Sequence, residues 1–101
     1  GALYREAGAD GLFVPYVVED GHIATIAGEC GLPLNVMARP GLPVAAKLEA
    51  LGARRLSSAT GLARAALAAL KTATTAFLET GDSDALSAAG GPPSANNKLF
   101  L

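Results

Sequence analysis

The sequence has no tryptophan and only one cysteine, and aromatic residues make up 5% of its 101 residues. The single cysteine, Cys30, excludes a disulfide within the chain and is typical of a reducing compartment. Eight basic and nine acidic residues give a net charge of −1, without a basic stripe. Together, the weak charge and the few aromatics argue against a nucleic-acid-binding protein.

Long hydrophobic runs are also absent. No apolar stretch approaches the roughly 18–20 residues that a transmembrane helix needs, and no signal peptide is visible. We therefore expect a cytoplasmic protein without a membrane partner. Hydrophobic residues make up 50% of the chain, but 22 of its residues are alanines. A core made by this chain alone would be thin, because alanine buries little surface.

The central feature of the sequence is the stretch 32–41, in which apolar and polar residues alternate with the two-residue period of a β-strand. One series comprises Leu34, Val36 and Ala38, and the other comprises Asn35, Met37 and Arg39. Pro40 and Gly41 then end the strand. Two flanking strands are predicted at residues 12–14 and 53–58.

Helix signals separate and follow these strands. The chain opens on a helix with Gly8 as its C-terminal cap, as if in mid-fold, and we expect it to be the C-terminal part of something longer. Asp20 is predicted to cap a helix over 21–30, which ends at Gly31. The residues expected on its buried face are Ile23, Ile26, Ala27 and Cys30.

Further helices are predicted toward the C-terminus. Pro43 is expected in the first turn of one that ends at Gly52, with Val44, Leu48 and Leu51 inward. Ser58 or Thr60 is expected to cap a long helix to about Leu78, with the stripe Leu62, Ala66, Leu70, Ala73 and Phe77. Asp82 or Ser83 can start a short helix to Ala89, before a Gly/Pro/Asn-rich tail over 90–101.

Repeated helix–strand units predict an α/β fold with a parallel sheet. The predicted strands start about 21–22 residues apart, near the minimum for a βαβ unit. In such a sheet the residues that follow each strand share one edge, where ligands bind. We expect residues 1–89 to form the folded part.

Four short sequence segments, in this order and with this spacing, resemble those of a known family. They are Glu6-Ala-Gly-Ala-Asp-Gly-Leu-Phe-Val-Pro15, Leu32-Pro-Leu-Asn-Val-Met37, Leu51-Gly-Ala-Arg-Arg-Leu-Ser57 and Gly61-Leu-Ala-Arg-Ala-Ala66. From Gly1 to Ala89 the chain resembles the C-terminal half of the isocitrate lyase/phosphoenolpyruvate mutase family, and in particular its phosphonomutase-like and methylisocitrate-lyase-like subgroup.

The resemblance implies a (β/α)8 (TIM) barrel, of which this chain would supply strands six to eight. It also implies a Mg²⁺ ion that holds a small 2-oxo acid or phosphonate while a C–C or P–C bond is cleaved or rearranged. The family's metal-binding acids and mobile loop come from earlier strands, so no catalytic or metal-ligating residue is identified in this chain. The segment alone is expected to be inactive.

By this resemblance Pro15 would follow the sixth strand, where better-known members of the family carry a Glu or His that contacts substrate. A proline side chain neither transfers a proton nor binds a carboxylate, which argues against isocitrate or methylisocitrate as the substrate. By its position Pro15 is a candidate substrate-binding residue. Alternatively, Pro15 forms a turn that ends the strand.

Asn35, Met37 and Arg39 would project from one face of the seventh strand, the inward face in a barrel. A guanidinium at the strand exit can hold a carboxylate or phosphonate through paired hydrogen bonds. Alternatively, Arg39 forms a surface salt bridge, and Asn35 is a satisfied interior amide. Arg54 and Arg55 start the last strand at the opposite end, where such residues serve stability.

Ser57, Ser58 and Thr60 join the last strand to the long helix. Free backbone N–H groups and the positive helix end make such a junction an anion site, and barrels bind phosphate there. Plain N-capping explains the same residues.

Three functional hypotheses remain open. The chain can be part of a lyase or mutase, or a segment for homo-oligomer assembly through the helix over 60–78, or a truncated product without activity of its own. Helix exchange between subunits is what the resemblance implies for the second.

Overall fold

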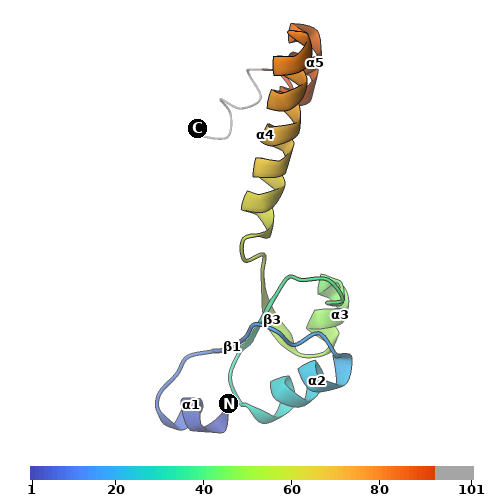
Figure 1. The fold of residues 1–101 in the computed structure, drawn as a ribbon. Helices are drawn as coiled ribbons and strands as arrows, with labels where there is room; N and C mark the ends of the chain where they lie inside the picture. The colour runs from blue at the N-terminus through green and yellow to red at the C-terminus, as the bar shows by residue number, and fades with distance from the viewer. Residues whose placement is uncertain (93–101) are drawn as a thin grey trace. The chain divides into compact units, whose positions relative to one another are not determined.

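The computed structural model describes residues 1–92 and alternates helices and strands, as Figure 1 labels them. The sequence of elements is α1 (Ala2–Glu6), β1 (Leu12–Val14), α2 (Asp20–Glu29), β2 (Leu34–Met37), α3 (Ala45–Ala50), β3 (Ala53–Ser57), α4 (Gly61–Thr80) and α5 (Ser83–Gly90). The chain divides into two compact units, Gly1–Gly61 and Leu62–Leu101. From residue 93 onward the predicted tail lies outside the described residues.

The three strands form a parallel sheet in the order β1-β2-β3, which confirms the predicted α/β arrangement. Leu12, Phe13 and Val14 pair with Leu34, Asn35 and Val36. On the other side, Val36 and Met37 pair with Leu56 and Ser57, and the register shifts once, between Leu34 and Asn35. The carboxyl ends of the strands therefore meet at one edge, as parallel pairing requires.

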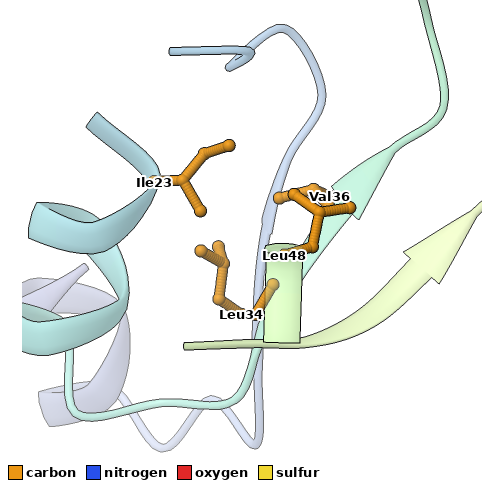
Figure 2. Packing of buried hydrophobic residues seen from close by; sticks show 5 residues of the cluster. Ile23, Leu34, Val36 and Leu48 are labelled. Carbon is orange, nitrogen blue, oxygen red and sulfur yellow. The ribbon is translucent and has the colours of Figure 1, made fainter. Parts of the chain in front are cut away.

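One face of this sheet carries the core. The side chains of Leu34 and Val36 on β2 are at most 1% exposed, and they pack against Ile23 of α2 and Leu48 of α3. Figure 2 shows these four side chains gathered between the strand and the two helices. The helices cover this face because each places its apolar stripe on it.

The other face of the sheet is less covered. Phe13 on β1 is 51% exposed, and Asn35 and Met37 on β2 are half-buried. The alternation predicted along β2 is thus confirmed as far as Met37. The strand stops there, and Ala38, predicted to continue the buried series, is exposed.

Two predicted helix starts are wrong. Glu19 occupies the N-cap of α2 without a side-chain hydrogen bond, and Asp20 is the first helical residue. The Asp20 carboxylate pairs instead with Lys47. Helix α3 begins after Val44, whose extended backbone (φ −65°, ψ 158°) keeps Pro43 out of the first turn and leaves the Val44 side chain 75% exposed.

The predicted glycine ends of the helices are confirmed, with positive φ at Gly8, Gly31 and Gly52, and Gly81 after α4 has a positive φ as well. Gly52 (φ +95°) is also sterically confined, because a Cβ there would lie 2.8 Å from the Cβ of Ala27. The turn before β3 therefore requires glycine for two reasons.

The second unit holds α4 and α5. Asp82 caps α5 as predicted, and its carboxylate accepts hydrogen bonds from the N–H groups of Asp84 and Ala85. Helix α4 has no buried residue: Leu62, Leu70 and Phe77 of the predicted stripe are 74%, 62% and 36% exposed. No helix within residues 1–92 is long and apolar enough to cross a membrane.

Candidate functional site at the carboxyl edge of the sheet

The predicted site residues follow the ends of three neighbouring strands in the first unit. Pro15 follows β1, Arg39 follows β2, and Ser57 ends β3. Because Val14 is in register with Val36, and Met37 with Ser57, these three chain segments leave the sheet at the same edge. In open α/β sheets ligands bind at this edge.

Arg39 lies in the loop beyond β2, not in the strand as the alternation predicted. The Ala38 N–H still donates to the Ser57 carbonyl at 2.7 Å, and the chain then turns, with the Leu42 N–H donating to the Arg39 carbonyl at 3.2 Å. The turn at Pro40 and Gly41 ends the pairing one residue earlier than the sequence pattern suggested. Arg39 is consequently exposed at the edge.

The Arg39 guanidinium lies over the ring of Tyr16, 4.8 Å from the centroid. Tyr16 stands in the turn directly after β1 and was not among the predicted site residues. Its only sequence signal is an aromatic residue at the end of a strand. Within residues 1–92 the structure contains an ion pair between Lys47 and Asp20. Arg39 forms none with these residues, so the surface salt bridge considered as its alternative role is not made there.

Asn35 contacts Arg55. In the amide orientation that satisfies both polar ends, its nitrogen donates to the Arg55 carbonyl at 3.1 Å and its oxygen accepts from Arg55 Nη1 at 3.2 Å. These bonds favour the interpretation that the Asn35 amide is a satisfied interior group that links two strands of the sheet. A role of Asn35 in binding substrate stays a prediction.

The junction after β3 is a short turn. The Ser57 hydroxyl donates to the Val36 carbonyl at 3.2 Å, which ties β3 to β2 at the edge. The Gly61 N–H donates to the Ser58 carbonyl at 2.8 Å, and Ala59 has a positive φ of 49°. Neither the Ser58 nor the Thr60 hydroxyl makes a capping bond within the described residues, and no hydrogen bond there joins Arg39 to this turn.

Pro15 and Met37 are half-buried at this edge. A depression of about 420 Å³ in the same unit lies elsewhere, at the amino ends of β2 and β3, and includes Gly31, Gly52 and Arg54 in its lining. Residues 1–92 contain no group of three or more His, Cys, Asp or Glu side chains placed to hold a metal ion.

Comparison with known proteins identifies the family. The family model described as phosphoenolpyruvate phosphomutase matches residues 1–78. The match spans all three strands and most of α4. These parallel strands and helices are part of a lyase/mutase fold, and the chain belongs to the isocitrate lyase/phosphoenolpyruvate mutase family. No curated protein matches the sequence significantly.

Two solved structures from Burkholderia cenocepacia J2315 are similar to this chain. One, named a "putative lyase/mutase", is 35% identical with a TM-score of 0.85 over 99% of this chain. The other, named a "putative phosphonomutase", is 33% identical with a TM-score of 0.67 over 71% of this chain. The chain spans 36% and 30% of the lengths of these two proteins.

Proposed function

We propose that this chain is the C-terminal part of a Mg²⁺-dependent lyase or mutase that cleaves or rearranges a C–C or P–C bond in a small 2-oxo acid or phosphonate. The observation that carries the proposal is the family match over residues 1–78. The 35% identity to the lyase/mutase over nearly the whole chain supports it. In this proposal β1, β2 and β3 are the last three strands of a (β/α)8 barrel.

Within that enzyme the chain would contribute an anion-holding rim. Arg39 is exposed at the carboxyl edge with its guanidinium free of carboxylate partners among residues 1–92, so it can present paired N–H donors to a carboxylate or phosphonate. Backbone N–H groups of the turn Ser57–Thr60 would add further donors. Met37 and Pro15 would supply apolar contacts beside them, and Asn35 a polar one.

The residues present here do not fit a Mg²⁺ site. Magnesium binds through carboxylates in near-octahedral geometry, and residues 1–92 bring no acidic cluster together. The proposal therefore places the metal ligands outside this chain. What these residues can do by themselves is bind and orient an anion. We also propose a cytoplasmic protein, since the lone thiol of Cys30 suits a reducing compartment.

The proposal is tested with the gene product that includes the sequence preceding Gly1. We expect Mg²⁺-dependent turnover of oxaloacetate, a methylisocitrate-type acid or phosphonopyruvate, with pyruvate release measured for the first two and phosphoenolpyruvate formation for the third. Pro15 argues against the methylisocitrate-type acid. No turnover with any of the three in a folded protein would overturn the proposal. The chain from Gly1 to Leu101 serves as a control that should be inactive.

A second candidate function is assembly of a homo-oligomer through α4. The observation that favours it is the set of large apolar side chains that α4 leaves exposed to solvent. An exposed apolar surface of this kind is typical of a helix that packs against a partner. The set is Leu62 (74% exposed), Leu67 (64%), Leu70 (62%) and Leu78 (78%). A second copy of this chain could cover them.

Light scattering coupled to size-exclusion chromatography tests the assembly. We expect an oligomer that Leu70→Glu dissociates, because the substitution places a carboxylate among the exposed leucines. Ala68→Glu is the matched control, since the exposed residue 68 lies about 160° around the helix from residue 70 and about 80° or more from the other three leucines. A monomeric wild-type protein would contradict this function.

A further inference from the structure

Tyr16 and Arg39 come from different strand ends and meet at the edge where the proposed substrate would bind. Tyr16 is 73% exposed and Arg39 is exposed as well, so neither side chain is held in place by burial. The guanidinium nevertheless lies 4.8 Å from the centroid of the Tyr16 ring. Within residues 1–92 Arg39 makes this contact with the aromatic ring and no salt bridge.

Stacking restrains an arginine without using its donors. The ring attracts the flat face of the guanidinium through its quadrupole, while the N–H groups point outward in the guanidinium plane. A long, exposed arginine otherwise loses side-chain entropy when it binds a ligand. An arginine already held over a ring has lost part of that entropy beforehand, so its binding of an anion is tighter.

We infer that Tyr16 is a positioning residue that holds Arg39 ready for the carboxylate or phosphonate of the substrate. This inference rests on the proposed function, because it assigns Arg39 to the anionic group of the substrate. Tyr16 itself acts only through Arg39. The aromatic ring is what matters, and the phenolic hydroxyl has no part in it.

Steady-state kinetics of the whole enzyme test the inference. Tyr16→Leu removes the ring and should raise KM about two- to fivefold with kcat unchanged, the effect expected for an exposed cation–π contact. Tyr16→Phe keeps the ring and should restore the wild-type KM. In an Arg39→Ala background Tyr16→Leu should have no further effect, since a positioning residue has nothing left to position.

The matched control is Tyr4→Leu. Tyr4 is 64% exposed on α1 and makes no cation–π contact with any of the residues 1–92, so its loss should leave KM unchanged. Equal KM values for Tyr16→Leu and wild type would overturn the inference. So would an equal effect of Tyr16→Leu with and without Arg39, because the ring would then act by another route.

A binding measurement separates this inference from the proposed function. The Nε–Hε signal of Arg39, followed by NMR during titration with inorganic phosphate, should show phosphate binding that Tyr16→Leu weakens two- to fivefold. Phosphate binding with this dependence, without turnover of any substrate, would defeat the proposed enzyme and leave the positioning role standing. Equal phosphate affinity in both proteins, or no binding at Arg39, would overturn the inference whatever the activity.

Discussion

Asn35 on β2 and Arg55 on β3 contact each other across the sheet: in the amide orientation that satisfies both polar ends of Asn35, Arg55 Nη1 donates to the Asn35 amide oxygen at 3.2 Å. Asn35 in turn donates to the Arg55 carbonyl at 3.1 Å. The two residues are in register just after the irregularity that follows Leu34. Their mutual bonds therefore fix how β3 aligns with β2, and with it which residues emerge at the carboxyl edge.

Removing the Arg55 side chain should weaken the sheet modestly. We expect Arg55→Ala to lower the free energy of unfolding by about 1 kcal/mol, because one hydrogen bond from a charged group is lost at a partly exposed site. Arg54→Ala is the matched control and should change stability by less than about 0.5 kcal/mol, since Arg54 is exposed and has no such partner among the described residues. Urea unfolding measures both. Equal effects would show that the Asn35 contact contributes nothing.

The sequence pattern alone was sufficient to predict where the strands lie and which face of β2 is buried. Alternation of Leu34 and Val36 with Asn35 and Met37 reports burial directly, because successive side chains in a strand point to opposite faces. Glycine ends such as Gly31 and Gly52 were equally readable, because few other residues adopt a positive φ.

The contacts at the edge were not readable from the sequence. Arg39 contacts Tyr16 because of the conformation of two loops. The periodic pattern of apolar residues predicts strands and helices, but it does not predict the conformation of a loop. Arg55 was expected at the far end of its strand, but the register irregularity places it beside Asn35. The sequence also did not show what covers the stripe on α4, since an amphipathic pattern does not identify the surface that packs on it.

Two valines make a matched test of the core. Val36 is fully buried among Ile23 and Leu48, whereas Val44 is 75% exposed. Val36→Ala should lower the free energy of unfolding by about 2–3 kcal/mol, from lost burial and the cavity left behind. Val44→Ala should change it by less than about 0.5 kcal/mol. Similar losses for the two would contradict the placement of the core between β2 and the helices. Denaturant titration is again the measurement.

Gly52 and Gly8 share a left-handed backbone but differ in their surroundings. At Gly8 (φ +90°) no atom of the described part of the chain, residues 1–92, lies within 4 Å of an added Cβ, whereas at Gly52 (φ +95°) the Cβ of Ala27 lies 2.8 Å away. Both alanine variants should lose about 1–2 kcal/mol of stability through backbone strain. Gly52→Ala should lose at least about 1 kcal/mol more through the clash.

A double variant isolates the steric part. In an Ala27→Gly background the methyl group that causes the clash is absent, so the excess loss from Gly52→Ala should disappear. Thermal unfolding of the four proteins of this cycle gives the coupling directly. An excess that persists without the Ala27 methyl group would mean that backbone strain alone distinguishes the two glycines.

The ion pair between Asp20 and Lys47 links the first turn of α2 to α3. The two side chains are 45% and 56% exposed, respectively, so water and salt screen their attraction. A double-mutant cycle with Asp20→Asn and Lys47→Met should give a coupling of about 0.3–1 kcal/mol at low salt. Because Asp20 also lies near the positive end of α2, Asp20→Asn should remain slightly destabilising without Lys47. In 1 M NaCl the coupling should vanish. A coupling that survives this salt concentration would mean that the pair is held by packing of the two helices and not by charge.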